Sequence, residues 1–146
     1  MKIIYYDEKY LNICATAVIK HYNNDDFGCN FTHERARLYL NEIINKPRFI
    51  GFLLLDKEVL VGFALCHLKT WDTTDELAID EFIISEHYQE KGLGTRLLDF
   101  ISTYSEELNL SGITTFTNVI PLSDFYRKND FIEHDISFLY KGFKHS

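Results

Sequence analysis

A short run with two glycines, Gln89-Glu90-Lys91-Gly92-Leu93-Gly94-Thr95, separates two stretches of different character. The stretch Leu77–Ile84 before it is apolar at nearly every position, which predicts a buried strand, and helix-like apolar spacing follows it. The first turn of a helix has N–H groups without intrahelical partners, and the helix dipole adds to their attraction for an anion. Glycine lets a phosphate approach the backbone closely, and Lys91 adds a positive charge. The run therefore predicts a phosphate-binding turn rather than a plain tight turn.

The same run resembles a motif of a known enzyme superfamily. Gln-x-x-Gly-x-Gly after an apolar strand is similar to the pyrophosphate loop of the GNAT superfamily of acyl-CoA-dependent N-acetyltransferases. It is not a Walker loop, because no Gly-Lys-Ser/Thr follows, and it is not a Rossmann fingerprint, because the third glycine is missing. The resemblance implies acetyl-CoA as the acyl donor, with its pyrophosphate bound by Gln89, Glu90, Lys91, Gly92, Leu93, Gly94 and Thr95.

The strand before the loop has a further role in this superfamily. The fourth and fifth strands splay apart, and the pantetheine arm lies in the gap, bonded to the backbone of the fourth strand. By register against Gln89, the resemblance implies Phe82, Ile83 and Ile84 as cofactor contacts. Because the contacts are made by main-chain groups, the same three side chains can also belong to the core.

Two carboxylates, Asp80 and Glu81, interrupt this apolar strand. A charge in such a strand needs a partner, because unpaired burial is costly. An acceptor amine arrives mostly protonated, and a carboxylate can take its proton before the amine attacks a thioester. Strand alternation predicts that the two side chains point to opposite faces. We predict Glu81, or failing it Asp80, as the general base, and the alternative is a hydrogen-bonded structural carboxylate at a strand edge or bulge.

A second segment, Asn118–Phe131, resembles the superfamily pattern Asn-x-x-Ala-x-x-Phe/Leu-Tyr-x-Lys-x-Gly-Phe. The resemblance implies Tyr126 as the proton donor to the departing CoA sulfur and Asn118 as a cofactor contact. The segment departs from the pattern, since its Asn-to-Tyr spacing is one residue longer, Pro121 replaces a small residue and Asp130 replaces glycine. The alternative role of Tyr126 is to pack a short helix onto the sheet.

The bulk properties restrict the class of protein. The 146 residues suit one domain, predicted over 1–146, and the 46% of hydrophobic residues indicates a globular chain. The net charge of −7 disfavours nucleic acid as the main partner.

No apolar run is long enough to cross a membrane, and the N-terminus turns acidic too early for a secretory signal. The three cysteines and six histidines show neither disulfide nor metal-ligand spacing, which predicts a cytoplasmic protein without a metal site.

The elements that must position these residues follow from apolar periodicity and turn signals. The predicted helices and strands are, in order, Lys2–Tyr6 (strand), Tyr10–His21 (helix), a helix from Thr32 to Asn45, Phe49–Leu55, Val59–Leu68 and Leu77–Ile84 (strands), Gly92–Leu108 (helix), Ile113–Thr117 (strand), Leu122–Lys128 (helix) and Ile132–Phe143 (strand). This is the order of elements in the GNAT fold, so the resemblance covers essentially the whole chain. It implies an α/β (α+β) domain with a central mixed, mostly antiparallel sheet, a splayed strand pair, and helices on both faces.

Together these features predict an N-acetyltransferase that moves an acetyl group from acetyl-CoA to a primary amine, of a small molecule, by direct transfer in a ternary complex. The alternatives are a protein or peptide N-terminal or lysine acetyltransferase, and a non-catalytic acyl-CoA-binding domain. The acceptor site would be built by the two N-terminal helices and the loops around Phe27 and Trp71. Their aromatic and acidic residues suit a cationic molecule such as a polyamine or aminoglycoside, and equally a surface loop or the contact of a homodimer.

Overall fold

The computed structural model describes residues 1–117 and 120–145 of the chain, which forms two compact units, residues 1–116 and residues 117–146. In the first unit the elements are β1 (Lys2–Tyr5), the short 3-10 helix η1 (Glu8–Tyr10), α1 (Leu11–Tyr22), α2 (His33–Ile44), β2 (Phe49–Asp56), β3 (Val59–Lys69), β4 (Glu76–Ile84), η2 (Glu86–Tyr88), α3 (Leu93–Glu107) and β5 (Ile113–Thr115). The second unit contains α4 (Ile120–Lys128).

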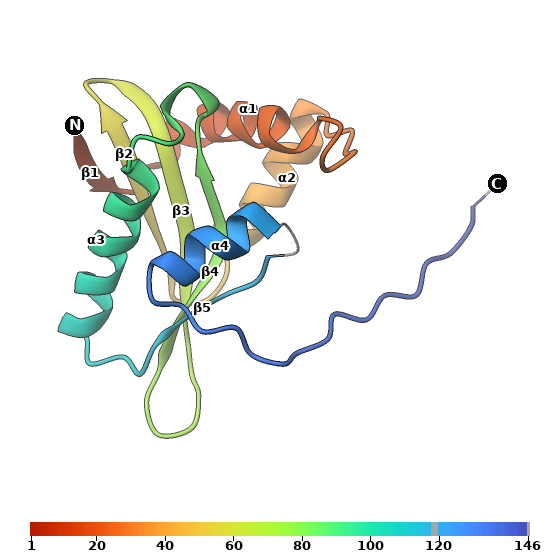
Figure 1. Cartoon of the computed structure of the whole chain (residues 1–146). Helices are drawn as coiled ribbons and strands as arrows, with labels where there is room; N and C mark the ends of the chain where they lie inside the picture. The colour runs from red at the N-terminus through yellow and green to blue at the C-terminus, as the bar shows by residue number, and fades with distance from the viewer. Residues whose placement is uncertain (118–119, 146) are drawn as a thin grey trace. The chain divides into compact units, whose positions relative to one another are not determined.

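The five strands form one sheet in the order β1-β2-β3-β4-β5 (Figure 1). The first four strands pair antiparallel, and β5 pairs parallel to β4, so the sheet is mixed and mostly antiparallel as predicted. The ladder between β4 and β5 covers only Leu77–Ile79, whereas β4 continues to Ile84 in its pairing with β3. The two strands therefore share a ladder over the first part of β4 alone, which is the splayed arrangement that the sequence predicts.

Helices cover both faces of the sheet, with α1 and α2 on one side and α3 on the other (Figure 1). Alternation along β2 explains this division, because successive side chains of a strand point to opposite faces. Leu53 belongs to the apolar core beneath α1 and α2, while its neighbour Phe52 contacts Phe100 and Tyr104 of α3 with ring centroids 5.7 and 5.3 Å apart. The central strands are thus buried on both sides, which accounts for their nearly continuous apolar sequence.

The pairing of β3 with β4 contains one irregularity. Leu65 lies opposite Glu81 and Cys66 lies opposite Ile79, so Asp80 is an extra residue on β4 without a counterpart on β3. Such a β-bulge bends the strand and changes the direction of its side chains. It lies directly after the last residue of β4 that pairs with β5.

Local sequence signals explain several element boundaries. Thr32 begins α2 as predicted, because its side-chain oxygen accepts a hydrogen bond from the N–H of Arg35 at 3.1 Å. The strand predicted over Ile132–Phe143 is wrong, since the described residues 131–145 contain neither helix nor strand. Alternating apolar residues are only half of what a strand needs, because its backbone must also find a hydrogen-bonded neighbour, and periodicity does not supply one.

Candidate active site

The predicted phosphate loop connects β4 to α3 through a tight and partly left-handed backbone. Glu90 and Gly92 have φ angles of 63° and 76°, and Gly92 is the N-cap of α3 without a side-chain cap. The first intrahelical bond runs from the N–H of Arg96 to the carbonyl of Gly92 at 3.1 Å. The N–H groups of Leu93, Gly94 and Thr95 therefore lie in the first helical turn, where backbone donors lack intrahelical partners. These residues are the ones that the motif predicts around a pyrophosphate.

Two hydrogen bonds, one from a side chain and one from the backbone, hold the start of the loop to the sheet. The amide of Gln89 donates to the carbonyl oxygen of Ile84 at 2.9 Å, and the N–H of Ser85 donates to Val61 at 2.7 Å. Lys91 lies with its Nζ 5.9 Å from the ring centroid of Tyr88. The side chain of Gln89 thus fastens the loop to the end of β4.

Glu81 is buried at 6% exposure and accepts hydrogen bonds from three uncharged donors. The hydroxyl of Tyr22 lies 2.8 Å from Oε2 and 3.1 Å from Oε1, and the hydroxyl of Tyr39 makes a short bond to Oε2. The backbone N–H of Phe82 completes the set, at 3.1 Å from Oε1. No basic side chain contacts this carboxylate among residues 1–117 and 120–145. The carboxylate is therefore solvated by dipoles but not balanced by a cation.

Burial is the main influence on the pKa of the Glu81 carboxyl group. Removal from water raises the pKa of Glu81 above its ordinary value, and this effect outweighs the opposing hydrogen bonds from the two phenols and the N–H. Burial, and then the charge of Glu81, also raises the pKa of Tyr22 and of Tyr39, so both phenols remain proton donors at neutral pH. The carboxylate of Glu81 thus keeps two phenol donors, Tyr22 and Tyr39, at neutral pH.

Five aromatic rings lie in contact around these phenols, with centroids 4.7 to 5.9 Å apart. This aromatic cluster consists of His21, Tyr22, Phe27, Phe31 and Tyr39. The loop between α1 and α2 is positioned by Asn23, whose side chain both donates to and accepts from the backbone of Phe31 at 2.8 Å. Next to the cluster is a hollow of about 250 Å³, which is lined by Phe31, Arg35, Leu38, Tyr39 and Glu42. Aromatic ring faces attract a cation through cation–π interactions, and a buried carboxylate attracts it by its negative charge.

Asp80 occupies the bulge and has charged partners of its own. Its Oδ2 lies 2.6 Å from Nδ1 of His67, and its Oδ1 lies 3.0 Å from Nζ of Lys46, directly after α2. The partners of Asp80 and Glu81 thus come from the same side of the sheet. The prediction that the two carboxylates face opposite sides is wrong, because the bulge adds a residue and breaks the alternation between them.

Comparison with known proteins gives a family to this geometry. A model described as the Acetyltransferase (GNAT) family matches residues 16–131, which is most of the chain. The chain belongs to the GNAT acetyltransferase family. Membership implies acetyl-CoA as the acyl donor. No curated protein matches this chain closely enough to suggest a more specific activity.

Solved structures of similar fold support the assignment of the GNAT fold. An aminoglycoside acetyltransferase from an uncultured soil metagenomic sample has a TM-score of 0.75 at 16% identity, with 98% of this chain and 96% of that chain covered. A possible acetyltransferase from Clostridium difficile 630 has a TM-score of 0.82 at 14% identity, with 99% and 98% covered. An aminoglycoside N-acetyltransferase in complex with CoA has a TM-score of 0.76 at 11% identity, with 97% and 93% covered. At these identities the likeness is one of fold.

The remaining GNAT candidates lie in the segment after β5. Tyr126 belongs to α4, and its ring contacts those of Phe125 and Phe131 with centroids 5.3 and 5.2 Å away. It is thus embedded among aromatic rings of its own unit. Asn118, the remaining predicted cofactor contact, lies outside the described residues.

Three residues around the carboxylates were not predicted from the sequence, namely Tyr39, Lys46 and His67, whereas Tyr22 is one of the aromatic residues that we expected near the acceptor. A signal for Tyr39 was present, because it lies on the apolar side of a predicted helix, where a buried phenol needs a hydrogen-bond partner. A buried glutamate on a neighbouring strand needs donors in turn. For His67 the sequence offers only a place on a strand, without a partner at characteristic spacing.

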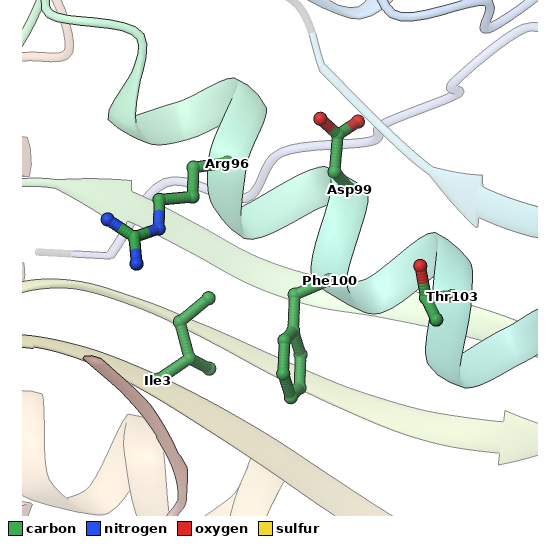
Figure 2. Close-up of a pocket in the computed structure, with 5 residues that line it drawn as sticks. All are labelled: Ile3, Arg96, Asp99, Phe100 and Thr103. Atoms are coloured by element: carbon green, nitrogen blue, oxygen red, sulfur yellow. The ribbon is translucent and has the colours of Figure 1, made fainter. Parts of the chain in front are cut away.

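A second hollow, with a volume of about 340 Å³, lies between β1 and α3. Figure 2 shows the residues that line it. It is lined by Ile3, Arg96, Asp99, Phe100 and Thr103. Arg96 also donates to the carbonyl of Met1 at 3.2 Å. This hollow lies on the α3 side of the sheet, away from the α1 and α2 side that provides the partners of Glu81. This hollow is therefore not our candidate for the binding site of the acceptor amine.

A metal-binding cluster of side chains and a membrane-spanning helix are both absent from the described residues. Among the described residues, no group of three or more His, Cys, Asp or Glu side chains is arranged to hold a metal ion. No helix in that part of the chain is long and apolar enough to span a membrane.

Proposed function

We propose that this GNAT protein transfers the acetyl group of acetyl-CoA to a primary amine of a small molecule, by direct attack in a ternary complex. The observation that carries the proposal is the position of the β4 carboxylates. Asp80 and Glu81 lie where β4 parts from β5, on the strand that leads directly into the glycine turn of α3. One strand thus connects an anion-binding helix start with acidic groups suited to an amine.

The cofactor would bind along this strand and its loop. The first-turn N–H groups of Leu93, Gly94 and Thr95 suit the pyrophosphate, and Lys91 adds charge beside them. The pantetheine arm would follow the backbone of Phe82–Ile84, beyond the end of the β4–β5 ladder.

The acceptor would bind on the α1 and α2 side. A carboxylate that is buried among uncharged donors is costly, and an ammonium group from a substrate would supply the missing counter-charge. The aromatic cluster adds cation–π attraction to the same ligand class. These features support a cationic small molecule as the acceptor. The aminoglycoside acetyltransferases of similar fold make aminoglycosides one group of amines to test.

The proposed reaction has a simple balance of bonds and protons. The ammonium group gives one proton to a base of the β4 carboxylate region, Glu81 or Asp80 with its partners. The free amine nitrogen then bonds to the thioester carbon, and the carbon–sulfur bond breaks. The second proton of the amine passes to water in this step, Tyr126 gives its proton to the departing sulfur, and water then returns a proton to Tyr126. Orientation of the two substrates in one complex provides most of the remaining acceleration.

Release of free CoA thiol from acetyl-CoA is the direct test. The protein is mixed with acetyl-CoA and, separately, with simple alkylamines, polyamines, aminoglycosides and peptides. We expect amine-dependent thiol release with at least one small cationic amine and formation of its acetamide by mass spectrometry. If the protein binds CoA but releases no thiol with any amine, it is a non-catalytic acyl-CoA-binding domain. If only peptides react, the acceptor is a polypeptide and the small-molecule assignment is wrong.

A further inference from the structure

We propose that His67, held by Asp80, is the catalytic base that takes the proton of the acceptor ammonium. This inference rests on the proposed acetyl transfer and specifies which residue beside the β4 carboxylates receives the proton. The negative charge of Glu81 then favours the ammonium group without receiving its proton, and Asp80 is a positioning residue that acts through the imidazole.

The contacts of Asp80 suit a residue that orients a base better than a base itself. Both of its oxygens are engaged, one by Nδ1 of His67 at 2.6 Å and the other by Nζ of Lys46 at 3.0 Å. Because Lys46 donates to the other oxygen, Oδ2 of Asp80 is available to accept the Nδ1–H of the imidazole. With the hydrogen on Nδ1, the lone pair of the neutral ring lies on Nε2.

Glu81 is less suited to the same task. Its two oxygens already receive two phenol hydroxyls and one backbone N–H, and only 6% of the residue is exposed. A proton that it accepted would have to displace one of these donors. The side chain of His67 is 21% exposed, so an imidazolium formed there can return its proton to water after each turnover. Nε2 has no hydrogen-bond partner in the described part of the chain.

The position of this pair fits the reaction. Asp80 is the bulge residue, and the bulge turns it toward the same side of the sheet as Glu81. His67 lies on β3 opposite Ala78, one residue before the last pair of the β4–β5 ladder. Among the described residues, the charged group that contacts the imidazole is Asp80 from β4, and Lys46 contacts the other oxygen of Asp80. Arg48 on the β2 side is occupied by Asp75 and Thr70.

Nε2 of His67 takes one proton from the ammonium, and the imidazolium is stabilised by the carboxylate of Asp80. The amine attacks the thioester carbon and the carbon–sulfur bond breaks. The second proton of the amine passes to water, and the sulfur takes a proton from Tyr126 and departs as the thiol, after which water returns a proton to Tyr126. His67 then releases its proton to water, which restores the neutral ring.

The test is His67→Asn, because the asparagine amide can still donate to Asp80 from about the place of Nδ1 but has no basic nitrogen. We expect kcat/KM to fall by roughly 10²-fold or more and its fall at acidic pH to disappear. Added imidazole should restore part of the rate, which a merely structural role would not allow. The matched control is His33→Asn, an exposed histidine at the start of α2, which should behave as wild type.

Different failures lead to different conclusions. If His67→Asn keeps the wild-type rate and pH profile while wild type releases thiol, acetyl transfer stands and His67 is not the base. If Glu81→Gln alone removes the acidic limb of the profile, Glu81 is the base and our proposal is wrong. If wild type releases no thiol with any amine, the acetyl transfer itself is wrong and the role of His67 is refuted with it. Should His67→Asn fail to fold by circular dichroism, His67→Gln with added imidazole applies the same criteria.

Discussion

Tyr39→Phe should destabilise the protein in a way that depends on pH. The substitution removes one hydroxyl and keeps the ring, so the contact of the ring with Phe31 is retained. What is lost is a short hydrogen bond to the buried carboxylate of Glu81. Hydrogen bonds to charged groups contribute about 1.5–3 kcal/mol, and neutral ones about 0.5–1.5 kcal/mol. We therefore expect a loss of about 2 kcal/mol when Glu81 is ionised.

The pH dependence follows from the direction of the pKa shift. Burial raises the pKa of Glu81 above 4.5, so the folded state binds more protons than the unfolded state between that value and the raised one. The free energy of unfolding therefore falls as pH rises through this window. The hydrogen bond from Tyr39 lowers the pKa of Glu81, and its removal raises that pKa further. The cost of Tyr39→Phe should thus be smallest near pH 4 and grow toward pH 8.

Guanidinium unfolding of both proteins at pH 4, 6 and 8 measures this difference. For a chain of this size a loss of about 2 kcal/mol corresponds to a fall in Tm of about 4–8 °C. Tyr6→Phe is the matched control, because the Tyr6 hydroxyl is buried without a hydrogen-bond partner in the described part of the chain. Its removal should be neutral or stabilising at every pH. A Tyr39→Phe cost below about 0.5 kcal/mol, equal at all three pH values, would refute the reasoning, since even a neutral hydrogen bond contributes that much.

Three further substitutions test the cofactor site and the proton donor. Gly94→Glu adds bulk and a negative charge within the first turn of α3 and should abolish CoA binding in calorimetry, while Thr103→Glu, near the other end of the same helix, should not. Glu90→Gly should tighten CoA binding at low salt, because it removes a negative charge from the loop that is predicted to hold the pyrophosphate. Equal affinity at low salt would contradict this. Glycine also adopts the φ of 63° found at Glu90 at little cost, so the fold should be kept. Tyr126→Phe should lower kcat by roughly 10²-fold with CoA affinity nearly intact, and a kcat within about threefold of wild type would leave this tyrosine a packing role.

The sequence alone was sufficient for the elements up to β5 and for the turn at Gly92, but not for the strand predicted over Ile132–Phe143. The largely apolar character of Leu77–Ile84 indicated a strand covered on both faces, and β4 spans Glu76–Ile84 with helices on either side. Gly92 indicated a turn before a helix, and it has the positive φ that glycine adopts at little cost. These features depend on neighbours within a few residues, so local periodicity and backbone preference are enough to predict them. The role of Tyr126 and the identity of the base remain predictions.

Only the tertiary structure decided the partners of the two carboxylates. Glu81 is bonded to Tyr22 and Tyr39, which are 59 and 42 positions away in the chain, and no spacing rule connects residues at such distances. Asp80 meets His67 because β3 and β4 are paired, and it lies on the same side as Glu81 because a bulge breaks the alternation. Both facts depend on strand register. The bulge at Asp80 shifts the register between β3 and β4, and the residue pattern along one strand does not locate such a bulge.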